Sequence, residues 1–233
     1  MNKPIIGIVS KPNIFCNTDL FTQQIIYDGV RCAILKNNGL CLGILPTQRT
    51  NKFFEKDDET DETKLSNQEK KDLYSLINRC DGVILEGGLS SASYELEIAK
   101  YAIKKDIPLL GICAGFNNII RAFGGTVVTL KKDTIHNQED GKLVHKNRIK
   151  KDSLLYSILD KKEIKVNSIH TMFALDKNIK NLEISAISDD GYVEAVELKR
   201  NKFVLGLAWH PELMLEQESM NKIFEVFINV CKK

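Results

Sequence analysis

The sequence predicts an α/β fold with a mostly parallel central sheet that gains antiparallel strands towards its end. Short apolar runs alternate with segments of helical periodicity, which is typical of successive strand–helix units. The apolar runs are nearly continuous, as expected of strands that are buried on both faces. The chain has 233 residues, which is the length of one large α/β domain, and we expect a single domain over residues 1–233.

The first half of the chain contains the clearest strand and helix patterns. Apolar residues at helical spacing alternate with short apolar runs that end in glycine, proline or polar residues. The expected strands are Ile5–Val9, Leu40–Leu45, Gly82–Leu85 and Pro108–Cys113, and the expected helices are Phe21–Lys36, Asp72–Asn78, Tyr94–Lys105 and Phe116–Phe123. The stretch Thr47–Lys71 is polar and rich in charge, and we expect a loop there that is either disordered or a lid over a site.

The second half of the chain changes character. Apolar and polar residues alternate over Glu183–Leu198, on both sides of the turn sequence Asp189-Asp190-Gly191. This pattern is typical of a β-hairpin, so we expect antiparallel strands to join the sheet. Val204–Trp209 is a further apolar run, and we expect it to form a buried strand that leads into His210.

Composition excludes several classes of partner. The chain has 33 Lys and Arg against 31 Asp and Glu, which gives a net charge of +2 and no case for binding nucleic acid or a membrane surface. The six cysteines form no C-x-x-C pair, which fits a reducing cytosol, and we expect a cytoplasmic protein. A zinc site would need cysteines that are not clustered for it, so we expect no metal and no cofactor.

Cys113 is the strongest candidate for a catalytic residue. It follows an apolar run and lies between Gly111 and Gly115, a pattern that resembles the strained turn of a nucleophile elbow. A thiol at the start of a helix is also stabilised as a thiolate by the helix dipole. The backbone amide of Ala114 would point into the same space, and that of Gly88 is a second candidate for an oxyanion hole.

His210 and Glu212 are candidates for a base and its orienting acid. Pro211 lies between them and fixes a kink that holds imidazole and carboxylate on one side. A neutral imidazole can take the thiol proton of Cys113, while a carboxylate on its other nitrogen sets the tautomer. The two segments are far apart in sequence, so this pairing requires the fold to bring them together.

His170 is the rival base. In a strand, Ser168 and His170 would share one face, opposite Asn167, and this face could bind a substrate. A histidine that only caps a strand end fits the same pattern. His136 and His145 lie in a polar stretch and rank below both other histidines as bases.

Taken in order, these motifs resemble class I glutamine amidotransferase-like proteins, and more closely the gamma-glutamyl-gamma-aminobutyrate hydrolase branch, peptidase family C26. The motifs that carry the resemblance are Gly111-Ile112-Cys113-Ala114-Gly115, Gly124-Gly125-Thr126, Val166-Asn167-Ser168-Ile169-His170, Asp190-Gly191-Tyr192-Val193-Glu194-Ala195 and Trp209-His210-Pro211-Glu212. The resemblance implies a flavodoxin-like three-layer sandwich and hydrolysis of a gamma-glutamyl amide through a thioester. It implies a nucleophile, base and orienting acid at Cys113, His210 and Glu212, an oxyanion hole at Gly88 and Ala114, and substrate contacts at Asn117, Asn167, Ser168 and His170.

The chain departs from this family where the substrate would be bound. The family usually has an arginine after the cysteine and a glutamine four residues after it, and here these are Ala114 and Asn117. The loop Gly88–Ala92 is short and neutral where the family commonly has an acidic residue. Thr171 and Met172 replace a second histidine and a glutamine. The resemblance therefore predicts the class of reaction better than the substrate.

Three functions remain open at this point. The first is a stand-alone hydrolase of a small gamma-glutamyl amine or peptide, with that small molecule as its partner and a homodimer as one arrangement. The second is a glutaminase subunit that supplies ammonia to a separate synthetase. The third is a redox or chaperone protein of the ThiJ/PfpI type, which is disfavoured because those proteins carry an acidic residue where this chain has Gly111 or Ile112.

Overall fold

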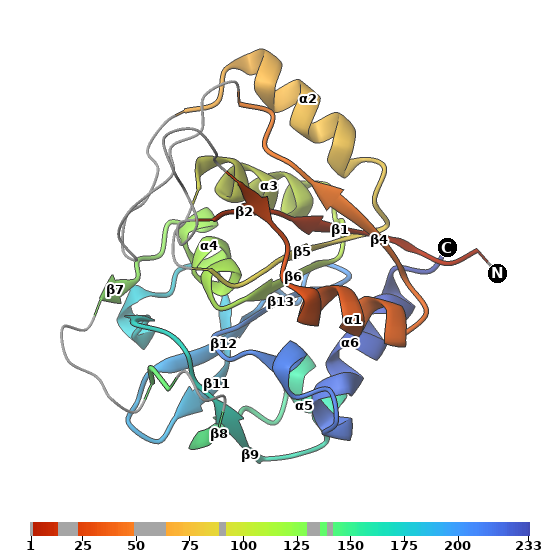
Figure 1. The fold of residues 1–233 in the computed structure, drawn as a ribbon. Helices are drawn as coiled ribbons and strands as arrows, with labels where there is room; N and C mark the ends of the chain where they lie inside the picture. The colour runs from red at the N-terminus through yellow and green to blue at the C-terminus, as the bar shows by residue number, and fades with distance from the viewer. Residues whose placement is uncertain (1, 14–22, 49–63, 89–91, 130–135, 139–141) are drawn as a thin grey trace.

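A nine-stranded sheet runs through the middle of the molecule (Figure 1). The computed structural model describes residues 2–13, 23–48, 64–88, 92–129, 136–138 and 142–233. In spatial order the strands are β4 (Leu40–Ile44), β1 (Ile5–Val9), β5 (Gly82–Leu85), β6 (Leu109–Ile112), β13 (Val204–Leu207), β12 (Val193–Glu197), β11 (Glu183–Ser188), β8 (Leu143–Ile149) and β9 (Glu163–Asn167). Two short pairs lie outside this sheet: β2 (Lys11–Pro12) with β3 (Gln24–Ile25), and β7 (Val128–Thr129) with β10 (Met172–Phe173).

The sheet has a parallel part and an antiparallel part. Strands β4, β1, β5, β6 and β13 pair in parallel. Strands β12, β11, β8 and β9 continue from β13 in antiparallel pairs, and β11 and β12 form the expected hairpin. The prediction of a parallel sheet with added antiparallel strands is therefore confirmed.

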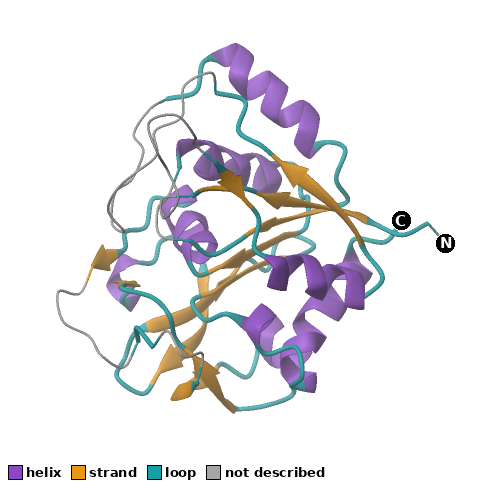
Figure 2. Ribbon diagram, in the orientation of Figure 1, coloured by secondary structure: helices purple, strands orange, loops and turns teal. Residues whose placement is uncertain are grey.

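Helices cover both faces of the sheet, which makes three layers (Figure 2). One face packs against α1 (Asp28–Lys36), α5 (Leu154–Leu159) and α6 (Glu218–Val230), and the other against α2 (Asn67–Ile77), α3 (Ser93–Lys104) and α4 (Ala114–Ala122). Each parallel strand contributes to both cores, because successive side chains point to opposite faces. In β5, Ile84 belongs to the first core, while Val83 and Leu85 belong to the second.

Two helix starts differ from the sequence predictions. The helix expected over Phe21–Lys36 begins at Asp28, because the residues just before it pair as β3 and Tyr27 is extended. The helix expected from Asp72 begins at Asn67, inside the stretch expected to be a loop. Its start is a capping box in which the Ser66 side chain accepts from the Glu69 amide and the Glu69 side chain accepts from the Ser66 amide.

The boundaries of the other expected helices and strands agree with the structure to within a few residues. Several elements of the structure were not predicted. Strands β8 and β9 and helices α5 and α6 were not among the expected elements. Residues 49–63 of the expected loop lie outside the described residues, so whether they form a lid stays a prediction. In the described part of the chain, every helix is too short or too polar to cross a membrane.

Candidate active site

The ends of three neighbouring strands meet at one edge of the sheet. The register pairs Leu85 of β5 with Gly111 of β6, and Ile112 of β6 with Leu207 of β13. Two residues beyond the β5–β6 pair, Gly87 and Cys113 are therefore level with each other. In open α/β sheets, ligands bind beyond the carboxyl ends of the strands, so this edge is where a site is expected.

Cys113 lies at a sharp turn between β6 and α4. Its backbone has φ 51° and ψ −105°, a conformation that costs a residue with a side chain about 1–3 kcal/mol and is often found at active sites. A Cβ atom at Gly111 would lie 2.6 Å from the Gly115 carbonyl oxygen, and one at Gly115 would overlap the Leu85 carbonyl group. Both flanking glycines are therefore required by close backbone contacts, as the elbow pattern predicts.

His210 and Glu212 form a tight pair beside the thiol. The Nδ1 atom of His210 lies 2.6 Å from Oε1 of Glu212, and Glu212 is buried. Burial lowers the pKa of His210, but the charges of Glu212 and Cys113 raise it more, so this pKa lies well above its ordinary value. The carboxylate therefore favours the protonated imidazole, whereas the sequence-based interpretation assigned a neutral one as the base. An imidazolium beside a thiol favours the thiolate.

Asn167 fixes the backbone of His210. Its Nδ2 atom donates to the His210 carbonyl oxygen over 3.0 Å, and its Oδ1 atom accepts from the His210 amide over 2.9 Å. Both bonds come from a fully buried side chain at the end of β9. The geometry gives Asn167 the task of positioning His210, which differs from the substrate contact implied by the family resemblance.

A cavity of about 670 Å³ opens beside the thiol. Six of the predicted site residues line it: Gly88, Cys113, Asn117, His170, His210 and Glu212. Ala114, Asn167 and Ser168 are not among the described residues of the lining. A substrate contact thus stays a prediction for Asn117 and His170, and the structure lends it no support for Asn167 and Ser168.

Two residues at the end of β5 also shape the site. A Cβ atom at Gly87 would lie 2.6 Å from Cε1 of His210, so only glycine leaves room for the imidazole. Glu86 is fully buried and accepts from the Tyr27 amide over 3.1 Å. Burial raises the pKa of Glu86 to about 8. Nothing in the local sequence indicates this packing requirement, because it depends on the position of a strand more than a hundred residues away.

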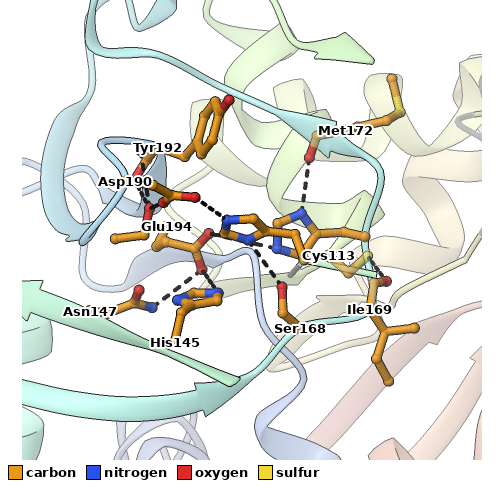
Figure 3. A network of polar contacts seen from close by, with 12 residues as sticks. Cys113, His145, Asn147, Ser168, Ile169, Met172, Asp190, Tyr192 and Glu194 are labelled. Carbon is orange, nitrogen blue, oxygen red and sulfur yellow. Dashed lines mark hydrogen bonds and ion pairs between the residues drawn. The ribbon is translucent and has the colours of Figure 1, made fainter. Parts of the chain in front are cut away.

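Behind the thiol lies a buried group of titratable side chains (Figure 3). It consists of His136, His145, His170 and Glu194, and we call it the histidine–glutamate cluster. Burial lowers the pKa of His170 to about 3 and raises that of Glu194 to about 8. The sequence ranked two of these histidines low as bases, and it contained no sign that three histidines meet at one carboxylate.

Comparisons with known proteins identify the family. The family model described as peptidase C26 matches residues 90–212. The Schizosaccharomyces pombe protein PB2B2.05, which is named for glutamine amidotransferases, is 36% identical over 190 residues, covering 68% of this chain and 72% of its own. Gamma-glutamyl-gamma-aminobutyrate hydrolase PuuD of Escherichia coli K12 is 27% identical over 192 residues, covering 69% and 75%.

Similarity to solved structures supports the fold. The glutaminase domain of the CTP synthase of Trypanosoma brucei, solved with bound acivicin, superposes with a TM-score of 0.66 at 16% identity, covering 98% of this chain and 94% of that one. At this identity the likeness concerns the fold alone. The family match and the S. pombe relative carry the assignment further: the chain belongs to the peptidase C26 family of class I glutamine amidotransferase-like hydrolases.

Proposed function

We propose that the chain is a cysteine hydrolase that cleaves the gamma-glutamyl amide bond of a small gamma-glutamyl amine or peptide. The observation that carries this proposal is that Cys113 and the His210–Glu212 pair face one cavity, with the thiol at a strained corner. A nucleophile, a proton carrier and an orienting carboxylate are the groups that acyl transfer requires. The hydrolase named for gamma-glutamyl-gamma-aminobutyrate supports the substrate class at 27% identity.

The reaction would proceed in two steps. The Cys113 thiolate attacks the gamma carbonyl carbon, and the tetrahedral intermediate collapses to a thioester while the amine leaves with the proton that His210 carries. Neutral His210 then takes a proton from water, whose oxygen attacks the thioester. Collapse of the second tetrahedral intermediate releases glutamate and the Cys113 thiolate, and the proton taken from water stays on His210, so the starting pair is restored. Glu212 holds the imidazole in the tautomer that both transfers need.

The oxyanion would be stabilised by two backbone amides. Ala114 is the first residue of α4, and amides in the first turn of a helix have no acceptor within the helix. The helix dipole adds partial positive charge at the same place. Gly88 lines the cavity with φ 152°, a backbone conformation that favours glycine. We therefore assign the oxyanion hole to the amides of Ala114 and Gly88.

Substrate recognition is where the chain differs from its family. The described residues that line the cavity include no lysine or arginine, in keeping with Ala114 at the position where the family usually has arginine. Asn117 is the polar side chain that we assign to the glutamyl part, since it lines the cavity and its Oδ1 atom has no hydrogen-bond partner among the described residues.

Trapping the thioester tests the proposal directly. Purified chain is mixed with gamma-glutamyl amides that have alkyl, cationic and carboxylate-bearing amines, and intact mass is recorded after acid quench. We expect a glutamyl adduct on the wild type that is absent from Cys113→Ala, together with release of glutamate. Adduct or turnover in Cys113→Ala contradicts the assignment of the nucleophile. Failure across the whole panel, in a folded wild type, contradicts the hydrolase proposal.

A second candidate is a glutaminase subunit that passes ammonia to a synthetase. The observation that favours it is the similarity in fold to the glutaminase domain of a CTP synthase. Glutamine hydrolysis measured with and without extract of the source cells separates the two. A stand-alone hydrolase prefers a gamma-glutamyl amine and is indifferent to extract, whereas a subunit prefers glutamine and is activated by its partner.

A further inference from the structure

The histidine–glutamate cluster gathers four potential metal ligands from four separate segments. His136 lies in a loop, His145 in β8, His170 just beyond β9 and Glu194 in β12. Each offers one ligand atom, these atoms all lie within 4.8 Å of one another, and all four residues are buried. Figure 3 shows the carboxylate of Glu194 next to the ring of His145.

The polar atoms at the centre of the cluster are under-satisfied. Nε2 of His145, Nε2 of His170 and Oε1 of Glu194 are buried and have no hydrogen-bond partner among the described residues. A buried polar group without a partner destabilises the folded chain. Several such atoms within 4.8 Å of one another indicate that a further group belongs among them.

The outer contacts of two imidazoles direct their lone pairs inwards. Nδ1 of His170 lies 3.2 Å from the Met172 carbonyl oxygen, which can only accept, so Nδ1 carries the proton and Nε2 has the lone pair. Nε2 of His136 lies 2.8 Å from Oδ2 of Asp190 and carries the proton. Its Nδ1 lies 3.2 Å from the Ser168 hydroxyl and 3.9 Å from Oε1 of Glu194, so a metal ion would take the lone pair that now accepts from Ser168. Histidines that bind metals commonly donate their other N–H to a carbonyl or a carboxylate in this way.

The distances between ligand atoms fit a small tetrahedral site after a modest contraction. Oxygen atoms of Glu194 lie 3.6 Å from Nε2 of His170, 3.9 Å from Nε2 of His145 and 3.9 Å from Nδ1 of His136. Zinc–nitrogen bonds of about 2.0–2.1 Å in a tetrahedron place neighbouring ligand atoms about 3.3 Å apart. The distances to Glu194 would therefore shorten by about 0.3–0.6 Å, and those between the histidine ligand atoms, all within 4.8 Å, by at most about 1.5 Å.

We propose that the histidine–glutamate cluster binds one Zn²⁺ ion. Imidazole nitrogen and carboxylate oxygen are common zinc ligands, and a site with four protein ligands leaves no open position, which is typical of structural zinc. The charges also balance, since the carboxylates of Glu194 and of the adjoining Asp190 offset the two positive charges of the ion. This proposal departs from the sequence-based expectation of no metal, which considered only sites with cysteine ligands.

The ion would act on the catalytic cleft through the segment that carries His170. This residue lines the cavity, and the carbonyl oxygen of its neighbour Ile169 lies 3.9 Å from the Cys113 sulfur. Zinc would tie that segment to β8 and β12 and so hold one wall of the cleft in place. Its task is to support the cleft, without contact with the reacting atoms.

Metal binding by the full-length chain, with any affinity tag removed, tests the proposal. After treatment with chelator and dialysis, the chain is titrated with Zn²⁺ by calorimetry, and Mg²⁺ serves as a comparison. We expect one Zn²⁺ per chain, no Mg²⁺, and a rise in Tm of about 5 °C or more. Co²⁺ in place of Zn²⁺ should give tetrahedral visible bands without the charge-transfer absorption of a thiolate ligand. A wild type that binds no Zn²⁺, or binds it through thiolate, overturns the proposal.

Variants locate the site. His145→Asn and Glu194→Gln lie on different strands, and each should abolish or greatly weaken Zn²⁺ binding while circular dichroism shows a folded protein. His210→Asn is the matched control, since it removes the chain's one histidine outside the cluster and should leave stoichiometric binding unchanged. Binding that survives in folded Glu194→Gln or is lost in His210→Asn contradicts the assigned ligands. If one variant fails to fold, the other and the Co²⁺ spectrum of the wild type still decide.

Discussion

Gly87 is the residue whose replacement tests the proposed geometry most sharply. A Cβ atom there would lie 2.6 Å from Cε1 of His210, where ordinary contacts begin at about 3.4 Å, but 3.5 Å from Cβ of Cys113, which is an ordinary contact. In Gly87→Ala the imidazole must therefore move by about 0.8 Å while the thiol keeps its place. The φ of Gly87 is not positive, so the substitution adds no backbone strain.

The magnitude follows from the displacement. A misplacement of about 1 Å in a catalytic group can cost about 10²-fold in rate, so we expect kcat/KM for a gamma-glutamyl amide to fall about 10²-fold. We expect the effect mainly in kcat, because His210 carries the proton and Cys113 is undisturbed. Alkylation of Cys113 by iodoacetamide at neutral pH should slow as well, since the thiolate loses its imidazolium partner.

A matched substitution separates this effect from a general loss of stability. Gly43→Ala adds the same methyl group in β4, where it meets only the flexible end of Ile26 at 3.0 Å. It should leave both the alkylation rate and kcat/KM close to those of the wild type. If folded Gly87→Ala keeps the wild-type kcat/KM within a factor of about two, His210 does not occupy the position that the proposed mechanism requires.

Three further predictions concern buried charges. Glu212→Gln removes the carboxylate that raises the pKa of His210. The alkaline limb of the pH–rate profile should therefore move to lower pH, and kcat should fall about 10²-fold. A limb that stays in place contradicts a functional His210–Glu212 pair. The pKa of Glu86 is raised from 4.5 to about 8 by burial, so its stabilising effect is complete below pH 4.5 and lost as pH rises to 8. The free energy of unfolding by denaturant should therefore rise in Glu86→Gln relative to the wild type by about 1.4 kcal/mol per pH unit between pH 5 and 8. Equal pH dependence of the free energy of unfolding in both proteins would refute this. Lys11 and Glu95 form a buried ion pair of 2.5 Å. Lys11→Met should therefore lower the free energy of unfolding in urea by about 3–5 kcal/mol, and adding Glu95→Gln should restore much of that loss. A loss below about 1 kcal/mol would contradict a buried pair.

The parallel strands were predictable because each of them is a short, continuous apolar run. Runs such as Gly82–Leu85 have no polar position to satisfy, since both faces are covered. The start of α2 was also present in the sequence, as the Ser66-x-x-Glu69 capping box, but the charge of the surrounding stretch obscured it. Strand β8 was missed for a different reason: it carries polar residues on both faces, because His145 and Asn147 point into the buried cluster.

The residues of the candidate site likewise fall into those that local sequence predicts and those that it does not. Cys113 was predictable because the flanking glycines are a local requirement of a strained turn. The need for glycine at Gly87 was not, because it arises from contact with His210 after the sheet has formed. The histidine–glutamate cluster was also hidden, since its members lie in four segments whose convergence depends on the antiparallel register of β8, β9 and β12. Local patterns predict the nucleophile, while its surroundings depend on tertiary structure.

The segment from Asn167 to His170 joins the two parts of the site. On one side, Asn167 holds the backbone of His210 through two hydrogen bonds. On the other side, Ser168 contacts His136 over 3.2 Å, and His170 belongs to the histidine–glutamate cluster. Alternation along an extended segment requires this division, because neighbouring side chains point in opposite directions. A group bound in the cluster would therefore fix the segment that positions His210, which gives the buried histidines a physical route to influence the proposed proton carrier without contact with the substrate.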